Sequence, residues 1–114
     1  MTIEQIKVVD YIGKDQETGD AVLTVSDHLE WDNTKEHCFL IQEKLNSYLR
    51  FIESGEMLDR FPDTGLRAIR FHIYFKFSPP RDAETFLNQT KRFLEKEASV
   101  LLQWEVFSSE MQSD

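Results

Sequence analysis

The sequence has little cysteine, glycine and proline, and it has no long apolar run. Cys38 is the single cysteine, which excludes an intramolecular disulfide and a zinc site built from several cysteines. The N-terminal sequence has no basic segment followed by an apolar stretch, and nowhere do about 18 apolar residues follow one another, as a membrane helix needs. We therefore expect a soluble, cytoplasmic protein.

Basic residues are also scarce. Thirteen Lys and Arg residues stand against 21 Asp and Glu residues, so the net charge is -8. This charge repels phosphate backbones and anionic lipids, and we expect neither nucleic acid nor a membrane as a partner. An acidic excess is typical of a protein that is simply soluble, or of one that attracts a basic protein partner. The sequence leaves both interpretations open.

The length and the hydrophobic content predict one domain. The chain has 114 residues, of which 40% are hydrophobic and nine are phenylalanine. Domains commonly have about 100 to 150 residues, and a second domain would leave too little chain for its own core. We expect residues 1–114 to form a single domain with a frayed tail at 108–114.

Hydrophobic periodicity predicts four strands and two helices. The strands are expected at residues 6–12, 21–26, 67–77 and 100–107, and the helices from residue 33 to near 55 and at residues 81–97. Each helix has one apolar stripe, and each strand has one more apolar face. We predict an α+β fold of order β-β-α-β-α-β, a two-layer sandwich with both helices on one face of a four-stranded mixed sheet.

The apolar stripes predict which side of each helix faces the core. The expected stripes are Cys38, Ile41, Leu45, Tyr48, Leu49 and Ile52 in the first helix, and Ala83, Phe86, Leu87, Thr90, Phe93 and Leu94 in the second. Leu40 and Phe51 lie close together in rotation on the other side of the first helix. They are candidates for a contact between two copies in a homodimer. The alternative is that the 56–66 loop or the C-terminal tail of the same copy covers them.

Two segments of the chain resemble a known family. YIGKDQETGDAVLTVSDHLEWD and LIQEKLNSYLRFIESGE, followed by a proline-containing turn, are similar to small bacterial domains known only as a domain of unknown function. The mark of the resemblance is an Asp-His-Leu-acid-Trp motif before the first helix, and the similarity runs from the first strand through the second helix. It implies a bacterial origin and a stand-alone domain, and it implies no activity.

The stretch SDHLEWD allows two interpretations. In the first, Asp27, His28 and Asp32, with His37 nearby, are the centre of a small metal-dependent or small-molecule enzyme. However, no motif such as His-Glu-x-x-His fixes two of these ligands on one helical face. A nucleophilic Cys38 is weaker still, because it points about 100° around the helix from His37.

In the second interpretation the stretch prepares the start of the first helix. Asn33 caps the helix, and Glu36 follows three residues later as in a capping box. Asp27 binds backbone amides of a turn, and Leu29 and Trp31 pack beneath the helix. This interpretation explains more of the residues, so we expect no metal, no cofactor and no catalytic residue, and only His28 and Glu30 are left without a structural role.

The third strand offers a different kind of site. Its polar side carries Arg70, His72, Tyr74 and Lys76, and Tyr11 of the first strand is expected on the same face of the sheet. This basic, partly aromatic row in an acidic protein is either a contact surface for a protein partner or a second copy, or a merely solvated face, and the sequence leaves both interpretations open. The function we favour is a non-enzymatic protein-interaction module, with an inhibitor or immunity-type role by analogy of size and charge.

Overall fold

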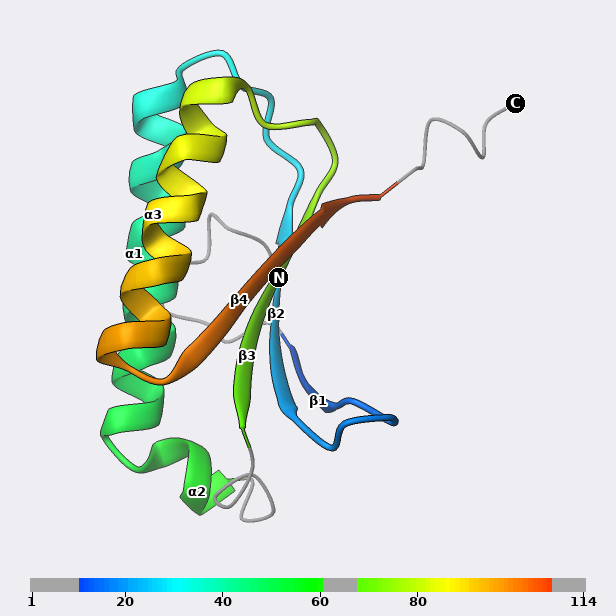
Figure 1. The fold of residues 1–114 in the computed structure, drawn as a ribbon, viewed down its shortest axis with the longest axis vertical. Helices are drawn as coiled ribbons and strands as arrows, with labels where there is room; N and C mark the ends of the chain where they lie inside the picture. Colours follow the sequence, from blue (N-terminus) through cyan, green and yellow to red (C-terminus); the bar gives the residue numbers. More distant parts are fainter. Residues whose placement is uncertain (1–10, 61–67, 108–114) are drawn as a thin grey trace.

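The computed structural model describes residues 11–60 and 68–107, and its element order matches the predicted one (Figure 1). The elements are β1 (Tyr11–Lys14), β2 (Ala21–Asp27), α1 (Thr34–Glu53), α2 (Glu56–Arg60), β3 (Ile69–Phe75), α3 (Arg81–Glu97) and β4 (Val100–Val106). The short α2 is the one additional helix. The predicted strand at 6–12, most of the 56–66 loop and the tail at 108–114 lie wholly or partly outside the described residues.

The four strands form one sheet in the order β1-β2-β3-β4. β1 pairs with β2 antiparallel, whereas β2 with β3 and β3 with β4 are parallel. A parallel connection needs a crossover, and here α1 and α3 make the two crossovers. Both lie on the same face of the sheet (Figure 1). The prediction of a two-layer α+β sandwich with a mixed four-stranded sheet is therefore confirmed.

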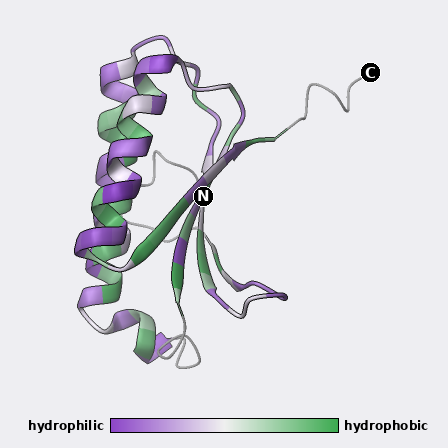
Figure 2. Cartoon of the chain, in the orientation of Figure 1, coloured by the Kyte–Doolittle hydropathy of each residue, from purple (hydrophilic) through white to green (hydrophobic). Residues whose placement is uncertain are grey.

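The core lies between the sheet and the two long helices. Apolar strand residues meet apolar helix residues there, and the β1–β2 turn, which lies away from the helices, is hydrophilic (Figure 2). The core residues are Leu23, Val25, Ile41, Leu45, Tyr48, Phe51, Met57, Phe71, Ile73, Phe75, Leu87, Leu94, Val100 and Leu102. Burial of each large side chain contributes about 1.5 to 3 kcal/mol relative to exposure.

The buried face of α1 is rotated away from its predicted stripe. Its buried residues are His37, Ile41, Lys44, Leu45, Ser47, Tyr48 and Phe51, whereas Cys38, Leu49 and Ile52 are half-buried. The expectation that Phe51 lies on an exposed side is therefore wrong: it is 7% exposed and belongs to the core. Apolar periodicity missed this because three buried residues of the face are polar.

The predicted stripe of α3 is confirmed in part, with Phe86 and Thr90 half-buried. Ala83, Leu87 and Leu94 are buried, but Phe93 is 57% exposed. In rotation, Phe93 lies on the edge of the stripe that faces α1 and not the sheet.

Both ends of α1 are capped, and the cap at the N-terminal end is the expected one. The Asn33 side chain accepts a hydrogen bond from the backbone amide of Glu36 at 3.1 Å. At the other end Gly55 has a φ of 85°, and its amide donates to the carbonyl of Ile52 at 3.2 Å. Glycine takes this left-handed conformation without the steric penalty of a side chain, so the chain turns here into α2.

Replacement of Gly55 by alanine tests the cost of this conformation alone. No atom lies within 4 Å of the added Cβ, so we expect Gly55→Ala to lower the free energy of unfolding by about 1 kcal/mol through the backbone. Urea unfolding followed by circular dichroism measures the change. Asn88→Ala, on an exposed position of α3, is the control and should not destabilise the protein; equal losses in both variants would contradict the explanation.

Candidate functional site

A buried hydrogen bond joins the end of β2 to the start of α1. Nε2 of His37 lies 2.5 Å from Oδ2 of Asp27, and the two side chains are 3% and 0% exposed. The other carboxylate oxygen of Asp27 accepts the amide of Leu29 at 3.1 Å, which confirms the predicted turn. Nδ1 of His37 is buried and has no hydrogen-bond partner within the described part of the chain.

Trp31 covers this pair. Its ring stacks on the imidazole of His37 with the centroids 3.6 Å apart and an angle of 17° between the planes. Its Nε1–H donates to the carbonyl of Phe77 at 3.1 Å, so it also attaches the end of β3. The predicted packing of Leu29 and Trp31 against the core is confirmed.

The three carboxylates and the single histidine of SDHLEWD do not converge on one point. Asp27 turns into the core, whereas His28, Glu30 and Asp32 are exposed. No three His, Cys, Asp or Glu side chains within residues 11–60 and 68–107 gather closely enough to hold a metal ion. The geometry is that of a structural clasp between strand and helix, which we call the Asp27–His37 clasp.

Sequence reasoning missed the Asp27–His37 clasp, although two signals were present. Asp27 continues the inward alternation of Leu23 and Val25 in β2, and His37 lies one helical turn before the buried Ile41. Both residues thus occupy core positions of their elements, and a polar residue in such a position needs a partner.

Loss of one partner should destabilise the fold strongly. We expect Asp27→Ala to lower the free energy of unfolding by about 3 kcal/mol, because it leaves a buried imidazole without its hydrogen bond. In a double-mutant cycle with His37→Leu, we expect the two losses to be non-additive by at least about 1 kcal/mol. Denaturant unfolding gives all four values. Glu30→Ala is the control, with a change within about 0.5 kcal/mol; additive losses would show that the two residues act independently.

The face of the sheet opposite the helices carries the predicted polar row. The rings of His72 and Tyr74 stack with centroids 4.3 Å apart and planes 6° apart. Nε2 of His72 lies 2.9 Å from Oε2 of Glu105 on the neighbouring strand, and Nη1 of Arg70 donates to Oε1 of Gln103 at 3.0 Å. The side chains of this face are therefore fixed to one another across β3 and β4.

The other residues expected in this row are placed differently. Lys76 is exposed and lies one residue beyond β3; its amide continues the pairing with the carbonyl of Asp27. Tyr11 lies in register with Thr24 of β2, which is in register with His72 of β3, so one strand separates Tyr11 from the row. Leu40 is half-buried and packs against the core, and Phe51 is buried in it, so these two do not form an exposed seam.

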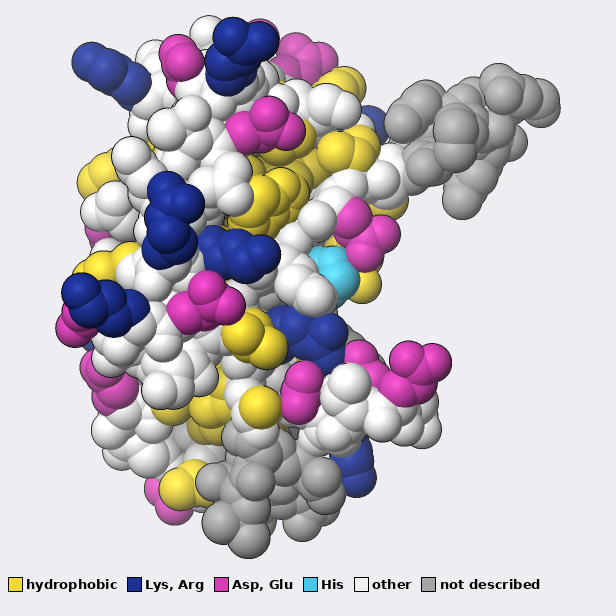
Figure 3. Space-filling model, in the orientation of Figure 1, with side chains coloured by type: hydrophobic (Ala, Val, Ile, Leu, Met, Phe, Trp, Pro, Cys, Tyr) yellow, Lys and Arg dark blue, Asp and Glu magenta, His cyan; other side chains and the backbone are white. Residues whose placement is uncertain are grey.

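The row is less basic than the sequence suggested, because acidic partners neutralise it. Nη2 of Arg70 donates to Oδ2 of Asp15 at 2.7 Å and lies 3.5 Å from Oδ2 of Asp20. Figure 3 shows acidic side chains gathered at the tip of the β1–β2 hairpin, beside the sheet. The hairpin thus adds negative charge beside the sheet face opposite the helices, which we call the open face.

Asp15 organises this hairpin. Its carboxylate accepts the amides of Thr18 at 3.0 Å and Glu17 at 2.8 Å. The hydrogen bond from Thr18, then that from Arg70, then that from Glu17 lower the pKa of Asp15 from 3.8 to about 2. Since the folded pKa is lowered, the contribution of Asp15 to stability is complete above pH 3.8 and disappears as the pH falls from there to about 2.

The titration of Asp15 can be observed directly. In Arg70→Gln we expect the pKa of Asp15 to rise above its value of about 2 but to stay below 3.8, because both amide hydrogen bonds remain. Carboxyl-detected NMR titration of both proteins measures this. An unchanged pKa of Asp15 in the variant would contradict the contact with Arg70.

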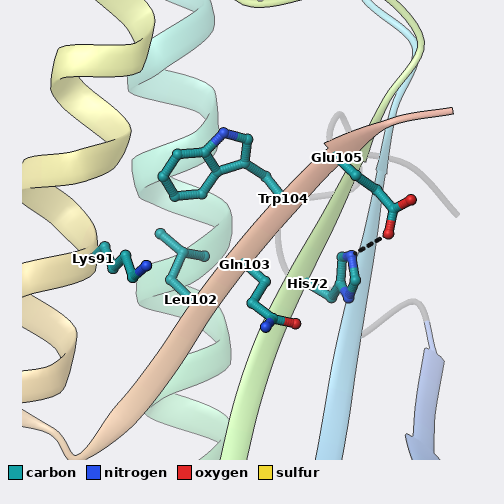
Figure 4. A pocket seen from close by; sticks show the side chains of 6 residues that line it. All are labelled: His72, Lys91, Leu102, Gln103, Trp104 and Glu105. Atoms are coloured by element: carbon teal, nitrogen blue, oxygen red, sulfur yellow. Dashed lines mark hydrogen bonds and ion pairs between the residues drawn. The ribbon is translucent and has the colours of Figure 1, made fainter.

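A hollow of about 370 Å³ runs along the outer edge of β4 (Figure 4). Leu102 and Trp104 line it from the helix side, and His72 and Glu105 from the open face. Lys91 reaches toward it from α3 (Figure 4). In the described sheet β4 pairs with β3 alone, so this hollow continues the open face around the edge of the sheet.

Cys38 does not have the surroundings of a nucleophile. Burial and then the charge of Asp82 raise the pKa of its thiol above the usual 9.0. The reactive thiolate is therefore disfavoured at neutral pH. This agrees with a partly buried residue that packs as a small hydrophobe.

Comparisons with known proteins give one match. The model of DUF6572, a family of unknown function, matches residues 1–108. No curated protein and no solved structure matches the chain. None of the helices in residues 11–60 and 68–107 is long and apolar enough to cross a membrane.

Proposed function

The chain belongs to DUF6572, a family of unknown function, and we propose that it is a non-enzymatic module that binds a protein partner through the face of its sheet that the described helices leave uncovered. The observation that carries the proposal is the fixed row of Arg70, His72 and Tyr74. Both long helices pack on the other face (Figure 1), so these side chains are the ones that a partner would meet.

The row has the properties of a prepared binding surface. His72 and Tyr74 hold each other by stacking, and His72 and Arg70 are bound across the strands. Side chains that are already ordered lose little conformational entropy on association. Tyrosine and arginine are also the residue types that most often dominate binding energy at protein interfaces.

The partner we propose is a basic protein. The chain has a net charge of -8, and the hairpin carboxylates and Glu105 border the open face. This charge accelerates the approach of a basic surface by electrostatic steering. A cytoplasmic bacterial protein of the inhibitor or immunity type is the role that we attach to this proposal, on size and charge alone.

Binding measurements on variants of the open face test the proposal. The partner is first isolated from the native cell with the tagged protein, and its dissociation constant is then measured by calorimetry. We expect Tyr74→Ala to raise this constant at least about tenfold, because the variant removes the tyrosine ring that stacks on His72 in the row. Glu105→Lys should slow association, most at low salt.

Leu58→Ala is the matched control. Leu58 is an exposed hydrophobic residue of α2 (49% exposed) and lies outside the row, so its loss should leave the dissociation constant unchanged. Circular dichroism checks that each variant is folded. A partner that binds Tyr74→Ala and Glu105→Lys as tightly as the parent protein would rule out the open face as the binding surface.

A further inference from the structure

The outer surface of the two long helices carries the two most exposed large hydrophobic side chains of the described residues. Phe39 of α1 is 56% exposed and Phe93 of α3 is 57% exposed. They lie on the side of the helices away from the sheet, so they are not part of the open face discussed above. Large exposed hydrophobic side chains that share one surface commonly mark a contact surface.

A groove between α1 and α3 connects them. One hollow of about 450 Å³ lies at the N-terminal ends of the helices beside Phe39, and another of about 440 Å³ lies farther along beside Phe93. The two share Gln42 and Phe86 as lining residues, so they form one continuous groove. Each exposed phenylalanine thus stands at one end of an apolar depression.

Two copies of α1 that run antiparallel have complementary residues along their groove sides. Helical spacing places Lys35, Phe39, Gln42, Asn46, Leu49 and Glu53 along this side. Position 44 is the midpoint of the stripe. When a second copy is placed antiparallel about that point, Lys35 faces Glu53 and Phe39 faces Leu49. Gln42 then faces Asn46.

The groove side of α3 has the same property. The stripe there consists of Asp82, Phe86, Gln89, Phe93 and Lys96. Reversal about Gln89 brings Asp82 to Lys96 and brings Phe86 to within one residue of Phe93. The charges at the two ends of each helix are therefore opposite, and the residues between them are apolar or amides.

The two midpoints lie at the same level of the helix pair. Gln42 is level with Phe86, because both residues line both hollows and so lie where the two hollows meet. The helices run in the same direction from there, since residues 34–42 and 82–86 line the first hollow and residues 42–49 and 86–94 line the second. Position 44 of α1 is therefore level with position 88 of α3, within one residue of Gln89. A single two-fold axis, perpendicular to both helices, relates both stripes to their own copies, as a symmetric dimer requires.

We propose that the protein forms a symmetric homodimer in which the α1–α3 surfaces of two copies pack face to face and antiparallel. Phe39 of each copy enters the hollow beside Leu49 of the partner, and Phe93 enters the hollow beside Asp82. Lys35 pairs with Glu53 and Asp82 with Lys96 across the interface. The charge complementarity at both ends is what identifies the occupant of the groove as a second copy.

The size of this surface predicts a reversible dimer. Two helices about 25 to 30 Å long and about 10 Å apart present roughly 500 Å² per copy. The total of roughly 1,000 Å² is at the lower limit for specific interfaces. We therefore expect monomer and dimer to be in equilibrium, with proportions that change with concentration.

Analytical ultracentrifugation over a range of concentrations tests the dimer. Phe93→Glu should raise the dimer dissociation constant at least about tenfold, because it places a charge in an apolar hollow. Leu101→Glu, at an exposed hydrophobic position of β4 (40% exposed), is the control and should leave it unchanged. A parent protein that is monomeric at every concentration, or a dimer that Phe93→Glu leaves intact, overturns the proposal.

A charge swap tests the antiparallel arrangement. Lys35→Glu and Glu53→Lys should each weaken the homodimer, since each puts like charges together at both ends of α1. A mixture of the two variants should form a heterodimer that is tighter than either homodimer, because all opposite charges then meet again. Equal affinities in the mixture and in the separate variants would exclude the antiparallel arrangement.

An engineered disulfide tests the position of the symmetry axis independently. In a Cys38→Ser background, Gln89→Cys should form an interchain disulfide on mild oxidation, because the two copies of this position meet at the axis. Asn88→Cys in the same background is the control: it lies on another side of α3 and should form the disulfide at least about tenfold more slowly. Equal rates would contradict the proposed axis.

Discussion

The placement of both crossover helices on one face is the constraint from which the other features follow. The parallel pairing of β2, β3 and β4 requires two long connections, and α1 and α3 supply them on the same side (Figure 1). The sheet is consequently apolar toward the helices and polar on the opposite face. The helix layer in turn has an outer surface that the sheet does not cover. The two surfaces proposed for binding are thus the two outer faces of one sandwich.

Polar residues inside the core decide how this sandwich is aligned. The Asp27–His37 clasp fixes the N-terminal end of α1 to the end of β2, and the hydroxyl of Tyr48 donates to the carbonyl of Thr24 at 2.8 Å farther along. Lys44 is fully buried between them, with Nζ 5.5 Å from the centre of the Tyr48 ring. Hydrophobic contacts would tolerate a helix that slides or rotates, whereas directional bonds specify one position.

The elements and the layer arrangement could be predicted from the sequence because they depend on local patterns. The alternation in β3 and the cap at Asn33 are examples, and both are present in the structure. The exact rotation of α1 could not be predicted in the same way, since its buried face includes His37 and Lys44. Their burial depends on partners distant in sequence or on contacts within the folded core. The neutralisation of Arg70 by Asp15 is likewise a contact between residues 55 positions apart.

One edge of the described sheet affects the behaviour of the protein at high concentration. β4 pairs with β3 alone among the described strands, has seven residues and exposes Leu101. A long edge strand can pair with the same strand of another molecule and start aggregation. Near the isoelectric point of about 4.8 the acidic charge that separates the molecules is lost. Aggregation through the edge of β4 therefore determines the lowest pH at which the molecules stay dispersed in solution.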